Sequence, residues 1–408
     1  MPALRLCPIA LAVALAGAGS VGAQTVKPAQ AQAWIDVATY SGVGLPAGMA
    51  NPMSALGSLF GGGGAKNAFG RTQGGQAGRW VDVTLSTRLN LQLADAEQAV
   101  PTGFLDPALK LQSRRDVRTP APDTGDDKAV EPDVERPRGK LLLYWGCGST
   151  VRAGQPKVLD MASASAADLA RFFQARRATQ RGTHAAEGRP VWPSPADARM
   201  VPAQASLVGP HAFSGQGVPA GFRFQIPPAQ DLMPPLVLQQ GGGGAATELS
   251  WTALPTARAY FVAGMGAAAQ DEMVIWTSSD VPDTGFGLVD YQTNPAVDRW
   301  LGEKVLLSPQ TTRCTVPKGV FAQGAGMLRL IAYGSELNLA HPPRPSDPKA
   351  VWEPEWAVKI RVKSVASVML GLPGEASEPA AEAEPAKDEK PQERKPGALD
   401  VLKGIFGR

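Results

Sequence analysis

The chain has 408 residues, with 40 Lys plus Arg and 37 Asp plus Glu, so its formal net charge is only +3. A charge so close to neutral excludes a general polyanion binder, which needs a strongly basic face. The length suffices for two domains, and 45 Gly with 37 Pro indicate much loop and linker.

Residues 1–23 have the pattern of a secretory signal peptide. Arg5 precedes the apolar run Leu6 to Ala16, which is shorter than the roughly 20 residues that cross a bilayer. Val21-Gly22-Ala23 then fits a signal peptidase site. We therefore expect a soluble periplasmic or secreted protein whose mature chain begins at Gln24.

Residues 24–113 are expected to form an N-terminal β segment with a Gly-rich loop. The tetrapeptides Trp34-Ile35-Asp36-Val37 and Trp80-Val81-Asp82-Val83 are alike and are interpreted as neighbouring strands. The Gly-rich stretch between them has no periodicity and is predicted to be disordered. Apolar residues alternate with polar ones from Val81 to Leu93, including Leu89 and Leu91, which predicts one long half-buried strand.

Residues 114–138 mix Pro with charged residues and are predicted to be a linker. A β module with one helix follows over residues 139–231. It begins with the buried strand Leu141 to Trp145, and Ser165 with Asp168 fits the capping box of its helix. The last strand of this module is predicted around Phe222 to Ile226.

Residues 232–365 contain the most regular strand patterns. One helix interrupts them, with Asn294 as the expected cap and Pro295 in the first position. The apolar alternation predicts the following strands: 236–238, 249–251, 259–263, 273–277, 312–316, 328–333 and 356–362.

This region resembles a fibronectin type III domain, within the immunoglobulin-like β-sandwich class. Leu249-Ser250-Trp251 and Tyr260-Phe261-Val262 are similar to that family's B and C strands. Residues 312–317 and 330–332 are similar to its E and F strands, and residues 356–362 would close the sandwich. The expected fold is therefore mainly β, an irregular N-terminal β module followed by an immunoglobulin-like sandwich with one inserted helix. The whole chain also resembles exported bacterial proteins of unassigned function.

The C-terminal end divides into two parts. Residues 373–396 are rich in Glu, Pro, Ala and Lys, which predicts a disordered linker. Residues 397–408 form a short amphipathic tail in which Leu402, Ile405 and Phe406 are candidates for docking on a partner groove or a membrane surface. The alternative is that this tail packs back on its own domain.

Cys147 and Cys314 are the two cysteines of the expected mature chain. In an oxidising compartment such a pair is a candidate disulfide. Cys147 also lies between Gly146 and Gly148, where a sharp exposed turn suits a nucleophile that His211 or His184 would activate. No family motif surrounds it, so the disulfide is the preferred interpretation.

Two further sets of residues are candidates for ligand binding. Asp280, Asp283 and Asp290 share one loop, where carboxylates serve acid–base chemistry, bind calcium or simply form turns. Trp192, Trp300 and Trp352 lie near loops and Pro, where an indole stacks on a ligand unless it belongs to the core. The three histidines have no metal-ligand spacing, so we expect no metal and no cofactor.

These observations favour an exported, non-enzymatic binding or structural protein of the cell envelope, with a protein or glycan partner and no nucleic acid. The alternative is an envelope hydrolase that uses Cys147 or the Asp280 loop. Lys359, Arg361 and Lys363 give the closing strand one basic face, which is expected to be solvated. The oligomeric state stays open.

Overall fold

The computed structural model describes residues 25–42, 67–74, 76–114, 139–173, 176, 182–241, 246–269, 271–322, 326–347 and 349–370. Within these ranges the protein is mainly β, as the sequence patterns predict. The expected signal peptide, the Gly61 to Gly64 stretch, nearly all of the linker and the whole C-terminal end lie outside the described residues.

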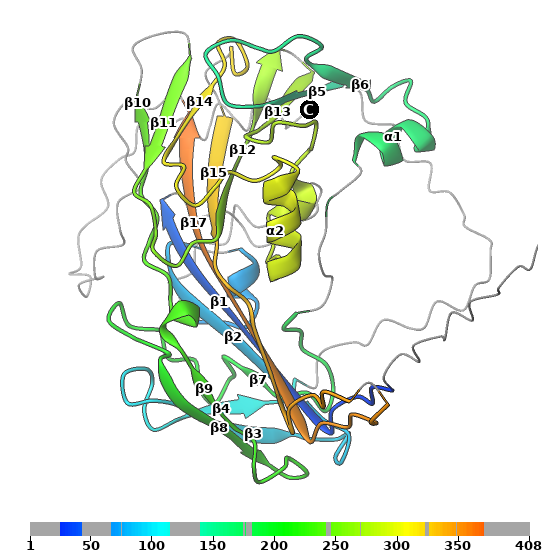
Figure 1. Cartoon of the computed structure of the whole chain (residues 1–408). Coiled ribbons are helices and arrows are strands. Elements are labelled where there is room, and N and C mark those ends of the chain that lie inside the picture. Colours follow the sequence, from blue (N-terminus) through cyan, green and yellow to red (C-terminus); the bar gives the residue numbers. More distant parts are fainter. Residues whose placement is uncertain are drawn as a thin grey trace, which may run out of the picture.

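Most strands belong to one long twisted sheet (Figure 1). Its order is β6 (Lys157–Asp160), β5 (Lys140–Trp145), β13 (Glu272–Thr277), β12 (Ala259–Ala269), β15 (Gly326–Tyr333), β17 (Trp356–Leu370), β1 (Ala31–Gly42), β2 (Gly78–Thr87), β7 (Val191–Trp192), β4 (Ala108–Gln112), β3 (Asp95–Ala99), β8 (Gly209–Gly215) and β9 (Arg223–Ile226). Beside this path, β16 (Leu337–His341) pairs with β17. Strands from all three predicted β segments thus share one sheet.

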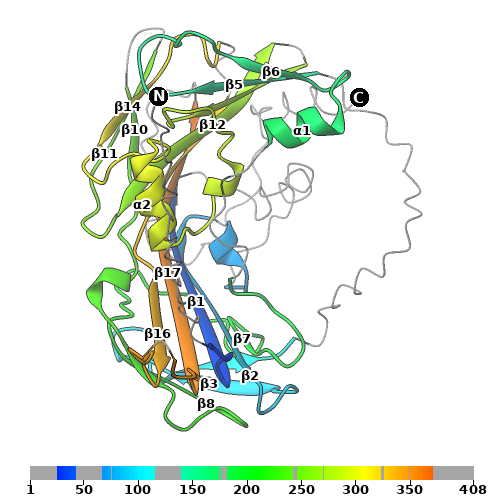
Figure 2. The ribbon, with the colours of Figure 1, turned by 45° about the vertical axis from the view of Figure 1, so that its right-hand side comes forward.

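Two long strands join the two ends of this sheet. Strand β17 pairs with β16 through residues 356–360 and with β15 through residues 363–370. Strand β1 runs parallel to β17 over its whole length and antiparallel to β2. Figures 1 and 2 show β1 and β17 crossing the molecule from the upper lobe, which holds β5, β6 and β10 to β15, to the lower lobe, which holds β3, β4, β7, β8, β9 and β16.

A second, small sheet covers one face of the upper lobe. It contains β10 (Leu238–Gly241), β11 (Thr247–Trp251) and β14 (Arg313–Val316). The predicted B and E strands pair here, as β11 with β14, whereas the predicted C, F and closing strands pair in the large sheet as β12, β15 and β17. This division between two packed sheets is compatible with a β-sandwich.

The main apolar core lies between the two sheets and continues into the lower lobe. In the lower lobe the ring of Phe222, just before β9, stacks on Trp356 of β17, with centroids 4.9 Å apart. The segment just before the last strand of the sheet therefore packs against the central strand β17.

The opposite face of the upper lobe is covered by helical segments. These are α2 (Asn294–Gly302) and η3 (Phe286–Leu288), whose apolar side chains pack on Phe261, Ile331 and Val365. Thr293, not Asn294, caps α2, because its hydroxyl accepts the Ala296 N–H. The remaining helices are α1 (Ala166–Phe172), which has the expected capping box, η1 (Arg71–Gln73) and η2 (Pro228–Gln230).

The strand predicted from Val81 to Leu93 ends earlier than its pattern suggests. β2 stops at Thr87, and Leu89 and Leu91 are 63% and 72% exposed. The Thr87 hydroxyl accepts the Leu89 N–H and the Asn90 side chain accepts the Gln92 N–H, so side chains hold a turn in place of a ladder. The apolar alternation continues through this turn by coincidence. Of the three leucines after β2, Leu89, Leu91 and Leu93, only Leu93 is buried.

Candidate functional site

Cys147 and Cys314 are joined. Their sulfur atoms lie 2.07 Å apart, between the turn after β5 and strand β14. Gly148 N–H also donates to the Thr315 carbonyl, so backbone and side chain both tie the large sheet to the small one. The bonded sulfur of Cys147 is no thiolate nucleophile, because that role needs a free thiol.

The two histidines that would have activated Cys147 have other partners. His211 on β8 is buried in the lower lobe, where its ring contacts Gln98, donates from Nε2 to the Leu207 carbonyl, and stacks on Phe224. Burial lowers the pKa of this imidazole. His184 contacts the Gly182 carbonyl and Arg189.

The three aspartates of the predicted loop do not converge. Each takes a different cation: Asp280 with Arg152 at 2.8 Å, Asp283 with Arg176 at 2.9 Å, and Asp290 with Lys363 at 3.8 Å. Burial raises the pKa of Asp283, while the Gly285 N–H and Arg176 oppose that rise. Across the described ranges no group of three His, Cys, Asp or Glu side chains is placed to hold a metal ion.

The candidate tryptophans are mostly core residues. Trp192 and Trp300 have no exposed surface, so a soluble ligand does not reach their rings. Trp352 is partly exposed, but its indole N–H donates to the Pro342 carbonyl and Arg344 lies over its ring at 5.7 Å. Leu402, Ile405 and Phe406 lie outside the described residues.

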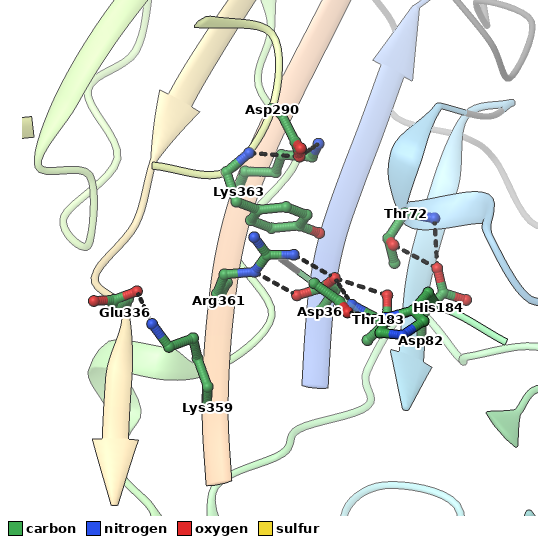
Figure 3. A network of polar contacts seen from close by, with 12 residues as sticks. Asp36, Thr72, Asp82, Thr183, His184, Asp290, Glu336, Lys359, Arg361 and Lys363 are labelled. Atoms are coloured by element: carbon green, nitrogen blue, oxygen red, sulfur yellow. Dashed lines mark hydrogen bonds and ion pairs between the residues drawn. The ribbon is translucent and has the colours of Figure 1, made fainter. Parts of the chain in front are cut away.

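A charged network at the junction of the lobes is the feature that sequence reasoning missed (Figure 3). Asp36 of β1 and Arg361 of β17 face each other on paired strands, and both are buried. Arg361 donates to the two carboxylate oxygens of Asp36 from Nε and Nη2, each at 2.6 Å. This bidentate geometry is the strongest form of a carboxylate–guanidinium pair.

A crossing segment of the chain covers this pair. Asp36 accepts two more hydrogen bonds, from the Thr183 N–H at 3.1 Å and the Thr183 hydroxyl at 2.7 Å. The backbone passes so close at Gly182 that a Cβ there would lie 2.2 Å from Arg361 Nη2. Any larger residue at this position would have to displace the paired Arg361 guanidinium. The Asp36 carboxylate accepts hydrogen bonds from both Arg361 and Thr183.

Asp82 of β2 anchors a second covering segment. It lies opposite Asp36 in the β1–β2 ladder and accepts hydrogen bonds from Gly70 N–H at 2.9 Å, Thr72 N–H at 3.1 Å and the Thr72 hydroxyl. Burial raises the pKa of Asp82 to about 7, although these hydrogen bonds oppose the rise. The carboxylate therefore holds η1 against the sheet.

Lys363 and Arg361 lie against the ring of Tyr291. The Lys363 ammonium is 4.1 Å and the Arg361 guanidinium 4.4 Å from the ring centroid, within the range of cation–π attraction. Burial lowers the pKa of Lys363 to about 8, with Asp290 as its carboxylate partner. Asp290 itself is 43% exposed, so this end of the network reaches the surface.

The prediction that Lys359, Arg361 and Lys363 form a solvated face is wrong for two of the three. Arg361 and Lys363 are each 2% exposed, because η3, Tyr291 and the Thr183 segment cover this part of β17. Lys359 is partly exposed and pairs with Glu336 at 3.1 Å. The available signal was the matched pair of aspartates, Asp36 and Asp82, on strands otherwise made of buried apolar residues.

The network is built for anchoring. Asp36 and Asp82 each accept several hydrogen bonds, and each of them binds a covering segment to the central strands. A shallow hollow of about 360 Å³ lies instead in the lower lobe over β3, β4 and β8, where Asp95, Glu97 and Lys110 line it.

Comparisons with protein-family models, curated proteins and solved structures found no significant match to the chain. The fold and the site define a mainly β protein with one long sheet, a disulfide between sheets and a buried ionic network. Among the described residues there is no helix long and apolar enough to span a membrane.

Proposed function

We propose that the chain is an exported, non-enzymatic binding or structural protein of the cell envelope. The observation that carries this proposal is the Cys147–Cys314 bond, which suits an oxidising compartment and removes the thiol that catalysis would need. The rival hydrolase loses its second site as well, because the aspartates of the 280–290 loop are separately paired with cations.

The arrangement of the upper lobe supports a binding role of the immunoglobulin-like kind. The small three-stranded sheet contains the strands that resemble B and E, and the large sheet contains those that resemble C, F and the closing strand. Such sandwiches present loops and faces on a rigid core and carry many unrelated binding functions. The partner in this proposal is a protein or a glycan of the envelope.

The C-terminal tail is the proposed contact with that partner. Leu402 and Phe406 lie one helical turn apart if the tail is helical, with Ile405 beside them. So short a helix needs a partner surface to form, which suits docking on a groove or a membrane. Burying three apolar side chains contributes only a few kcal/mol before ordering costs, so the contact is expected to be reversible.

Affinity capture from envelope fractions tests the proposal. The bait is the expected mature chain, residues 24–408, compared with a Leu402→Asp/Phe406→Asp variant. A Leu89→Asp/Leu91→Asp variant is the matched control, because it adds the same charges at exposed leucines of the lower lobe. Each captured component is then purified and titrated against the bait.

We expect a protein or glycan that binds saturably to the wild type and the control and at least tenfold less tightly to the tail variant. Equal binding by all three proteins would contradict a role of the C-terminal tail in the contact. No saturable partner in any fraction would contradict the binding function itself. Mass spectrometry of the extracellular or periplasmic protein checks export, which predicts Gln24 as the first residue; a chain that retains Met1 would contradict it.

A further inference from the structure

One cation on the sheet face of the charged network lacks the counter-charge that its neighbours have. Arg329 of β15 is half-buried, and its buried Nε has no hydrogen-bond partner among the residues that the structure describes. Arg361 has Asp36 and Lys363 has Asp290, but no carboxylate of the described residues lies within ion-pair distance of Arg329. A buried guanidinium N–H without an acceptor costs free energy and calls for an explanation.

The ionisable groups that interact with Arg329 do not neutralise its positive charge. These are the phenols Tyr40 and Tyr333, whose hydroxyls donate to the carbonyls of Thr72 and Leu288. Burial raises the pKa of both phenols, so they are neutral at physiological pH. Burial correspondingly lowers the pKa of Arg329, although a guanidinium remains charged.

The neighbouring strand adds two groups that suit an anion. Ser367 of β17 lies directly opposite Arg329 in the ladder, and its hydroxyl forms no hydrogen bond within the described part of the chain. Lys363 precedes Ser367 by four residues, so the two side chains point to the same face of the strand. Figure 3 shows the Lys363 side chain beside that of Arg361. The charge on Arg329 lowers the pKa of Lys363, so the two cations are close enough to repel each other.

We propose that Arg329 and Ser367 bind a small oxyanion, a carboxylate or a phosphate group, within the positive field of Lys363. A guanidinium presents two parallel N–H donors that match the oxygens of either group, and the hydroxyl supplies a third donor. The anion comes either from solution or from the chain's own Glu-rich segment, residues 374–394. This inference is independent of the proposed binding function.

Thermal unfolding of residues 24–408 in sodium phosphate, sodium acetate or sodium chloride, at equal ionic strength, tests the site. We expect a saturable rise in Tm with phosphate or acetate that exceeds the change in chloride. Arg329→Gln should weaken the apparent affinity at least tenfold. Arg299→Gln is the control, because it removes an arginine that is 63% exposed and outside this site.

The stability of the anion-free variant is a second measure. Arg329→Gln removes an unpaired charge, so its Tm without anion should equal or exceed that of the wild type. NMR titration of the Arg329 Nε–Hε resonance in the wild type gives a third measure that does not depend on the variant folding. A truncation after Pro373 separates the two sources, since the chain's own carboxylates would block free anion only in the longer chain.

A saturable anion effect that requires Arg329, in the full or the truncated chain, supports the site. A stronger effect in the truncated chain identifies the chain's own carboxylates as the source, and equal effects in the two chains identify an anion from solution. If neither chain shows a saturable effect beyond chloride, or if Arg329→Gln responds like the wild type, the site does not exist.

Discussion

Replacing Asp36 by Asn removes one charge from the most deeply buried ion pair described. The change keeps the shape of the side chain but leaves the Arg361 guanidinium, 2% exposed, without its two charged acceptors. Breaking a buried pair from one side typically costs about 3–5 kcal/mol, because the remaining charge is desolvated and uncompensated. We expect a loss of that size in the free energy of unfolding.

Urea unfolding followed by tryptophan fluorescence measures this loss. Glu353→Gln is the matched control, because it neutralises a carboxylate whose partner Lys27 is 52% exposed, and such surface pairs contribute about 0–1 kcal/mol. The double variant Asp36→Asn/Arg361→Met should be more stable than Asp36→Asn alone, since it removes both charges of the pair and leaves neither buried without its partner. A loss below about 1 kcal/mol for Asp36→Asn would refute the reasoning.

Thiol counting on denatured, unreduced protein should find neither Cys147 nor Cys314 free, and Ala at both positions should lower stability by up to about 5 kcal/mol, because the closed loop is long; two reactive thiols would contradict the bridge. Because burial raises the pKa of Asp82 from 3.8 to about 7, the stability that this group contributes is complete below about pH 4 and is lost as the pH rises through 7. Denaturation at pH 5 and pH 8 should therefore show a smaller decline for Asp82→Asn than for the wild type, and equal declines would rule this out. Leu93→Ala should cost about 2–5 kcal/mol, whereas Leu89→Ser should change stability by less than about 0.5 kcal/mol; similar losses in urea would restore the single long strand.

Local patterns were enough to predict the mainly β class. Apolar alternation or a short apolar run identified Trp34 to Tyr40, Leu141 to Trp145 and most strands after residue 232. The strand predicted over 236–238 is displaced, because β10 begins at Leu238. The likeness of the segments around Asp36 and Asp82 correctly placed them on neighbouring strands. The same alternation was wrong between Leu89 and Leu91, where side-chain hydrogen bonds of the turn outweigh the pattern.

Tertiary structure decided what the charged residues do. Whether Arg361 faces water or a carboxylate depends on the parallel pairing of β17 with β1, across more than 300 residues of chain, and no local pattern encodes that register. The proximity of Cys147 to Cys314 likewise depends on how the small sheet sits on the large one. The sequence by itself identified the strands with a regular apolar pattern and the available cysteines, because these follow from local periodicity and composition; β3, β4, β6, β8 and β16 were not predicted. Only the fold determined which charges are buried together, because an ionic interaction depends on distance in space and on exclusion from water.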